Sequence, residues 1–207
     1  MKIYTKTGDQ GETGMLGGVR ISKSSIAIDV TGGLDETNSV LGIVASQLNQ
    51  PSSDQVAIGN SVQPMIYQIQ NDLFDLGSRV SACLSESGRA VEFSSERTVV
   101  LEQWIDQLQQ DLPELTAFIL PGGSFAGSFL HQARAVCRRT ERGLVSLAEA
   151  DLAWPDASSI AGDQRLSIEL AYLNRLSDLL FVMARYVNHQ AGCEEPKWQP
   201  TRGNEPS

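Results

Sequence analysis

Five stretches of this chain repeat apolar residues at the three- and four-residue spacing of an amphipathic helix, with breaker residues between them. Each apolar stripe must be buried against another element, and connections of this length favour antiparallel neighbours. The pattern therefore predicts an all-α fold, an antiparallel five-helix bundle. The stripes lie at residues 34–48, 62–76, 100–108, about 125–149 and about 166–187.

The regions outside these stripes are rich in breaker residues. The first 30 residues hold many Gly, Thr and Ser, which predicts an ordered loop with room for a short strand. Pro64 should kink the second helix or mark its true beginning. A long loop is predicted at 151–164. From residue 192 the chain has several prolines and no periodicity, so we expect one domain over 1–191 and a loosely ordered tail over 192–207.

Charge and cysteine content restrict the class of protein. Sixteen Lys and Arg against 25 Asp and Glu give a net charge of -9, which argues against general attraction to nucleic acid or an anionic membrane. Cys83, Cys137 and Cys193 are far apart and form no C-x-x-C pair, so we expect free thiols in a reducing compartment. The start of the chain lacks the apolar core of a signal peptide, and no stretch approaches roughly 18 apolar residues. The expected location is the cytoplasm.

The Gly-rich N-terminal segment combines backbone freedom, hydroxyl groups and positive charge. It runs through residues 5–13 and 17–23 and carries Lys6, Arg20 and Lys23. These properties suit a polyphosphate, although an ordinary Gly-rich surface loop has the same composition. Residues 17–24 nearly spell the P-loop pattern G-x-x-x-x-G-K-[ST], but a serine replaces the second glycine. A phosphate loop here must belong to a different fold.

The fourth predicted helix carries a stripe of like charges. Arg134, Arg138 and Arg142 follow one another at four-residue spacing, with His131 and Glu141 at neighbouring positions of the same face. Like charges at this spacing destabilise a helix by about 0.2–0.5 kcal/mol per pair, whereas a hydrogen bond to a charged group contributes about 1.5–3 kcal/mol. The stripe favours an anion bound beside it. The alternative is a solvated face whose arginines pair internally with Glu141.

Other polar residues stand inside apolar runs. Asn174 and Asp178 lie four residues apart in the fifth helix, and Asp35 lies in the first. Such groups either satisfy internal hydrogen bonds or face a ligand, and one of the acids can have a purely structural role. Phe118 precedes the turn at Pro121, and its residue type alone indicates a core anchor as readily as a ligand contact.

Five blocks of sequence occur together in a fixed order. The chain resembles the PduO-type ATP:cob(I)alamin adenosyltransferases over nearly its whole length, through residues 5–9 with 17–18, then 34–39, 118–123, 134–142 and 172–185. The resemblance implies a homotrimer with each active site at a subunit interface. It also implies ATP as co-substrate with Mg²⁺, cobalamin as corrinoid substrate, and ATP binding by Thr5, Lys6, Thr7, Gly8, Asp9, Gly17, Gly18, Lys23, Arg138, Glu141, Arg142 and Asn174.

The same resemblance assigns the reaction. Arg138 would act at the triphosphate, Arg134 would pair with Asp35 across the subunit interface, and Phe118 would press on the lower face of the corrin. Co(I) would attack the 5′ carbon of ATP and expel triphosphate, so no side-chain nucleophile is needed. A reductase would supply the electron, and an adenosylcobalamin-dependent enzyme would receive the product.

Two other classes of function compete with this interpretation. A nucleotide hydrolase or kinase would use the Gly-rich loop, but the broken P-loop pattern counts against it, and its product would be a diphosphate. A non-catalytic helical interaction module explains the bundle but not the phosphate loop together with the arginine stripe. A ferritin-like di-iron bundle is excluded, because neither His131 nor His189 has a glutamate three residues before it.

Overall fold

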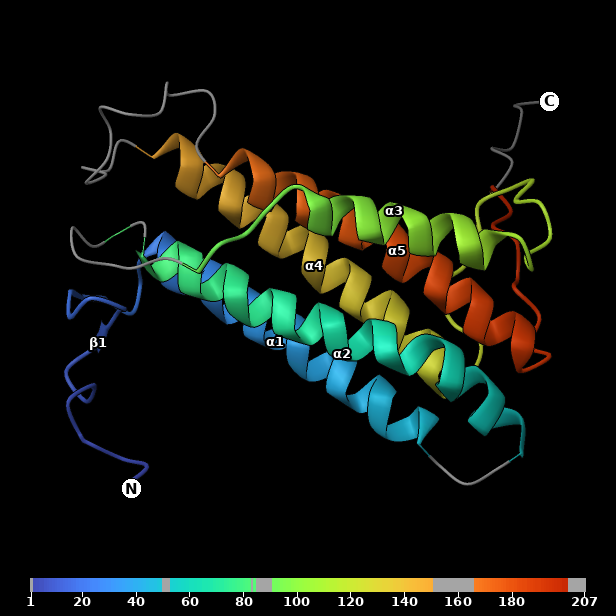
Figure 1. The fold of residues 1–207 in the computed structure, drawn as a ribbon, viewed down its shortest axis with the longest axis horizontal. Coiled ribbons are helices and arrows are strands. Elements are labelled where there is room, and N and C mark those ends of the chain that lie inside the picture. Colours follow the sequence, from blue (N-terminus) through green and yellow to red (C-terminus); the bar gives the residue numbers. More distant parts are fainter. Residues whose placement is uncertain (1, 50–52, 83, 85–90, 151–165, 201–207) are drawn as a thin grey trace, which may run out of the picture.

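The computed structural model describes residues 2–49, 53–82, 84, 91–150 and 166–200. Its described part is mostly helical, and successive helices run in opposite directions (Figure 1), which confirms the predicted five-helix architecture. A small hairpin precedes them. The elements are β1 (Glu12–Gly14), β2 (Arg20–Ser22), α1 (Ile26–Leu48), α2 (Ser53–Ala82), α3 (Glu96–Gln109), α4 (Phe125–Glu149) and α5 (Ser167–Gln190).

Helix α4 occupies the middle of the bundle. It packs against α1 on one side and α5 on the other, while α2 covers α1 and α3 covers α5 (Figure 1). Fully buried leucines and isoleucines from these helices, among them Leu41, Ile69, Leu130 and Leu176, form one continuous core. Burying each such side chain contributes about 1.5–3 kcal/mol, so the apolar stripes account for the assembly.

Helix α1 begins earlier than predicted, and the loop expected over the first 30 residues ends at Ser25. The Ser25 side chain accepts a hydrogen bond from the Ile28 amide and caps the helix. Gly33 lies inside α1 because α4 crosses it closely: a Cβ at Gly33 would lie 2.3 Å from the Thr140 hydroxyl oxygen. This glycine therefore marks a helix contact, although in the sequence it resembles a loop signal.

Helix α2 also extends beyond its predicted stripe of 62–76, from Ser53 to Ala82, so Pro64 lies inside it and does not begin it. The limits of α4 and α5 follow the predictions more closely. Helix α4 spans the expected residues 125–149, and α5 ends at Gln190, beyond the expected limit near 187. None of the described helices is long and apolar enough to cross a membrane. The predicted loop at 151–164, Cys83 and residues 201–207 lie outside the described residues.

The chain after α5 turns back along the segment between α3 and α4. The Leu120 amide donates to the Pro196 carbonyl at 2.8 Å, and the Trp198 amide donates to the Phe118 carbonyl at 2.7 Å. Ile119 and Lys197 form an antiparallel bridge. The first part of the tail, expected to be loosely ordered, thus has regular backbone partners as far as Trp198.

Candidate functional site

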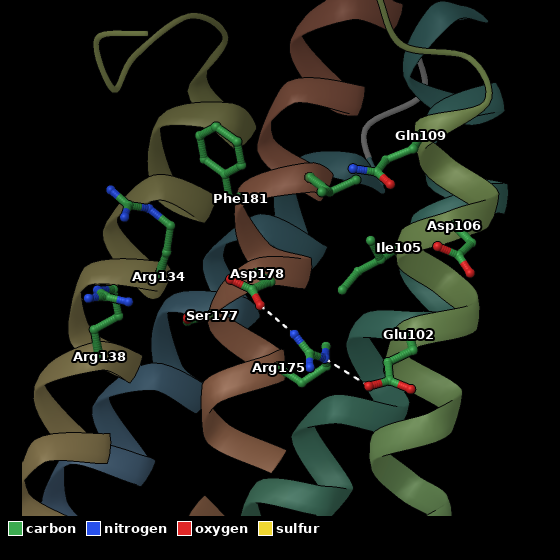
Figure 2. Close-up of a pocket in the computed structure, with 11 residues that line it drawn as sticks. Glu102, Ile105, Asp106, Gln109, Arg134, Arg138, Arg175, Ser177, Asp178 and Phe181 are labelled. Carbon is green, nitrogen blue, oxygen red and sulfur yellow. Dashed lines mark hydrogen bonds and ion pairs between the residues drawn. The ribbon is translucent and has the colours of Figure 1, made fainter. Parts of the chain in front are cut away.

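A cavity of about 610 Å³ opens between α3, α4 and α5 (Figure 2). Helix α4 contributes Arg134 and Arg138, which lie one turn apart along its surface. The α5 and α3 walls hold one arginine, three acids and several apolar groups, namely Arg175, Asp178, Phe181, Val182, Glu102, Ile105 and Asp106. A mixed apolar and charged concavity of this size is the usual form of a small-molecule site.

The three arginines of this cavity differ in their partners. Arg175 lies between two acids, with its Nε 3.0 Å from Glu102 and its Nη1 2.7 Å from Asp178 (Figure 2). Within the described parts of the chain, Arg134 and Arg138 form no ion pair, and the buried Arg134 Nε has no hydrogen-bond partner. Burial and then the charge of Arg138 lower the pKa of Arg134. Two cations without a counter-ion therefore face the cavity.

His131 lies one turn before Arg134 and is 5% exposed. Neither of its ring nitrogens has a hydrogen-bond partner among the described residues, and its ring lies 6.0 Å from that of Phe181. Burial, followed by the charge of Arg134, lowers the pKa of His131, so the ring is neutral at neutral pH. The part of α4 beside the cavity thus holds buried polar atoms without described partners, namely the ring nitrogens of His131 and the Nε of Arg134.

The structure brings four of the predicted ATP-binding residues together on the outer face of α4 and α5. The Asn174 amide donates to the Glu141 carboxylate at 2.9 Å, which links the two helices. One turn along α4, an Arg142 Nη1 donates to the Arg138 carbonyl at 3.1 Å. Glu141 pairs with Asn174 in this arrangement, and the arginines of the stripe have no acid partner among the described residues, contrary to the internally paired alternative.

The N-terminal loop folds on itself at the end of the bundle where α1 begins (Figure 1). Arg20 donates to the Thr7 carbonyl at 2.7 Å and pairs with Glu12 at 3.3 Å, while the Thr5 and Thr7 hydroxyls lie 2.8 Å apart. Gly8 stands beside the Lys23 ammonium, since a Cβ there would lie 3.2 Å from it.

Several loop residues have backbone angles that suit a close approach to a ligand. Lys6, Gly17 and Gly18 have positive φ values of 61°, 87° and 83°. This conformation is uncommon for a lysine and favours glycine. The loop residues Thr5–Asp9, Gly17, Gly18 and Lys23 do not line the cavity between α3, α4 and α5. Within one chain the predicted phosphate loop therefore lies apart from the cavity that Arg134 and Arg138 line.

Asp35 and Phe118 also lie away from this cavity. Asp35 is exposed on α1 and lines a second cavity of about 360 Å³ beside Phe74 and Leu16, so it does not face Arg134 within the chain. Phe118 is 79% exposed and meets the Trp198 ring edge to face, with centroids 6.4 Å apart. The alternative of a core anchor at Phe118 is excluded by this exposure.

Sequence reasoning passed over two features of the site. Phe181 and the acids of α3 line the cavity, but in the sequence they look like ordinary members of amphipathic helices.

Among the described residues, no group of three or more His, Cys, Asp or Glu side chains could hold a metal ion. Burial raises the pKa of the Cys137 thiol and makes it a poor nucleophile.

Comparison with known proteins gives consistent matches. The family model described as cobalamin adenosyltransferase matches residues 3–187. A cobalamin adenosyltransferase of Cupriavidus metallidurans is 39% identical over 97% of this chain and 96% of its own length. A corrinoid adenosyltransferase of Mycobacterium leprae is 39% identical over 90% of this chain and 91% of its own.

A solved structure has the same fold. A variant of a PduO-type ATP:corrinoid adenosyltransferase from Lactobacillus reuteri, complexed with cobalamin and ATP, superposes with a TM-score of 0.79 at 32% identity. The match covers 96% of this chain and all of that one.

Proposed function

The chain belongs to the cobalamin adenosyltransferase family, and from this membership we infer that it catalyses the ATP-dependent adenosylation of corrinoids. One observation in the chain itself carries this function. Arg134 and Arg138 face a cavity without a counter-ion, and the buried Arg134 Nε has no partner among the described residues. Because a buried donor without an acceptor is costly, an anionic ligand that accepts from Arg134 and Arg138 would satisfy this site.

We propose that the anion is the triphosphate of ATP. In the reaction the cobalt lone pair of Co(I) forms the bond to the 5′ carbon, and the bond from that carbon to the triphosphate oxygen breaks. Charge collects on the leaving triphosphate, where Arg138 can stabilise it. Glu141 and Arg142 lie within about one turn of Arg138 on α4, and Asn174 of α5 donates to Glu141, so these three residues would fix the nucleotide.

The full ATP site would require two subunits. Thr5, Lys6, Thr7, Gly8 and Asp9, with Gly17, Gly18 and Lys23, suit a triphosphate, yet one chain keeps this loop apart from Arg138. We propose a homotrimer in which the loop of one subunit meets the α4 face of its neighbour. Such an arrangement would also bring Asp35 of α1, which is exposed, to Arg134 of the neighbouring subunit, whose Nε has no partner among the described residues.

Mg²⁺ would reach the site on the nucleotide. The described residues offer no cluster of carboxylates and imidazoles that could cage the ion. Mg²⁺ in nucleotide sites is commonly held by phosphate oxygens and water, so this lack is compatible with a magnesium complex of ATP.

Phe118 would act on the corrinoid. Its ring is largely exposed, although water does not favour an exposed aromatic surface of this size. We propose that the ring covers the lower face of the corrin and excludes water and the nucleotide base from cobalt. Without that axial ligand, an electron can be added to Co(II) at a more accessible potential.

The decisive experiment is incubation of the purified protein with ATP and chemically reduced cobalamin. We expect the light-sensitive spectrum of adenosylcobalamin and one equivalent of triphosphate. Release of diphosphate would instead identify a kinase or hydrolase, and the absence of both products would favour a non-catalytic module.

A further inference from the structure

One buried arginine joins two segments that are far apart in the sequence. Arg185 of α5 is 5% exposed, and its Nε lies 3.0 Å from the Glu195 carboxylate in the chain that follows α5. Its Nη2 donates to the Pro113 carbonyl at 2.9 Å, at the start of the segment that leads to α4. A single guanidinium therefore anchors both segments.

The two anchored segments meet again at Phe118. Residues 193–198, which we name the C-terminal strap, pair with residues 118–120 through the amides of Leu120 and Trp198. The Lys197 ammonium adds a contact of 2.9 Å to the Thr116 hydroxyl. The strap thus runs antiparallel beside the segment that carries Phe118 and ends with Trp198 against its ring.

Core packing does not hold the Phe118 side chain, since 79% of it is exposed. Its described contacts are the edge-to-face ring contact with Trp198 and the backbone hydrogen bond from the same residue. A ring that must cover one face of a flat ligand needs a fixed position, because displacement by about 1 Å from the productive geometry impairs catalysis. The strap is the part of the described chain that can supply it.

We propose that the C-terminal strap positions Phe118 and that Arg185 and Glu195 are the positioning pair that fixes the strap. The proposal rests on the function proposed above for Phe118. Arginine suits this place because its planar guanidinium can bind a carboxylate and a carbonyl at once, which the single ammonium of a lysine does less well. Trp198 then transmits the position of the strap to the ring.

The test compares turnover of cobalamin by four proteins: wild type, Trp198→Ala, Phe118→Ala and the double variant. Each is assayed from Co(II) with a mild reductant and again from cobalt already reduced to Co(I). Trp198 is 52% exposed, so its removal leaves the core intact. We expect Trp198→Ala to lose about three- to tenfold in turnover from Co(II), with little change from Co(I) or in the KM for ATP.

The double variant separates positioning from an independent contribution. If Trp198 acts through Phe118, the double variant is no slower than Phe118→Ala alone. Losses that multiply, or wild-type turnover in Trp198→Ala, would overturn the role of the strap. A Phe118→Ala protein with wild-type turnover would instead contradict the proposed function of Phe118, so the two failures are distinguishable.

A second pair of variants tests the anchor. Glu195→Ala breaks the ion pair with Arg185, and Glu194→Ala removes an exposed acid from the adjacent position as a matched control. In Glu195→Ala, the amides of Leu120 and Trp198 should exchange with deuterium at least about tenfold faster, with the same selective loss of turnover from Co(II). Unchanged exchange in folded Glu195→Ala would overturn the anchoring role.

Discussion

The bundle contains two clusters of buried polar groups, and they differ in how completely their members are paired. Between α2, α3 and α5, Asp72 accepts hydrogen bonds from Arg97 at 2.7 Å, Tyr172 at 2.9 Å and Gln68 at 3.0 Å. At the cavity end of α4, His131 and the Nε of Arg134 are buried without described partners. The first cluster is complete within one chain, while the second needs something from outside.

The difference separates a structural role from a binding role more sharply than residue type does. Both clusters contain an arginine and lie on the inner surfaces of amphipathic helices. A fully satisfied network fixes the packing of its helices, whereas an unsatisfied one favours a ligand or a partner subunit.

Asp72→Ala should cause the largest loss of stability. Asp72 is 3% exposed, and its removal leaves the Tyr172 hydroxyl and the Arg97 guanidinium without their shared acceptor. Breaking such a buried pair costs about 3–5 kcal/mol, measurable by urea unfolding. The control is Asp75→Ala, which removes a second partner of Arg97 that is 31% exposed and should cost about 0–1 kcal/mol. Equal losses would mean that burial does not distinguish the two acids.

Arg138→Ala should have the opposite profile, with activity lost and stability kept. Removal of a group that stabilises charge in the transition state lowers turnover by about 10²–10³-fold. Loss of like-charge repulsion on α4 should leave unfolding nearly unchanged. Arg139→Ala is the matched control, because Arg139 is also exposed on α4 but pairs with Glu36. If Arg138→Ala kept wild-type turnover and ATP affinity, the assignment of this face of α4 to the ATP site would be wrong.

The proposed contact between Asp35 and Arg134 of two subunits can be tested by charge reversal. Asp35→Arg or Arg134→Asp alone should weaken corrinoid binding or the trimer, and the two reversals together should restore part of the loss. Residues in contact show coupling energies of about 0.5–3 kcal/mol. A double-mutant cycle of corrinoid affinity and trimer dissociation gives this value. Simple additivity would mean that the two side chains do not meet.

His131 should give the smallest effect, a sensitivity of stability to acid. Its pKa is lowered in the folded chain, so below about pH 6.5 the unfolded chain binds more protons and stability falls as the pH falls. Above that pH both states are neutral and the ring contributes no pH dependence. Urea unfolding of wild type and His131→Gln between pH 7.5 and 5.5 compares the slopes. A slope equal to that of wild type would assign the acid sensitivity to other groups.

The helical periodicity was enough to predict the bundle, because a continuous apolar stripe has few ways to leave water. It placed α4 correctly, since Ser124 caps one end and the apolar stripe runs unbroken to the other. It misplaced the start of α1, because Gly32 and Gly33 resemble a loop until Thr140 is known to lie against Gly33. A close crossing of two helices depends on residues that are far apart in the sequence, and helical periodicity carries no information about such pairs.

The candidate site was predictable in its residues but not in its grouping. Spacing alone put Arg134, Arg138 and Arg142 on one face, and the order of the motif blocks indicated the family. Spacing could not show that Arg175 pairs with Glu102 and Asp178 while Arg134 has no acid partner in the described part of the chain. Nor could it show that the N-terminal loop lies apart from the arginines, or that the tail reaches Phe118.

Local spacing and residue identity were enough to predict the five helices, the family and the chemical types gathered on each face. They could not show which charges are paired or which segments meet, because pairing and burial arise from contacts between distant parts of the chain. Arg185 is an example: the residues that precede it in the helix are apolar, and its partners Pro113 and Glu195 come from two other segments.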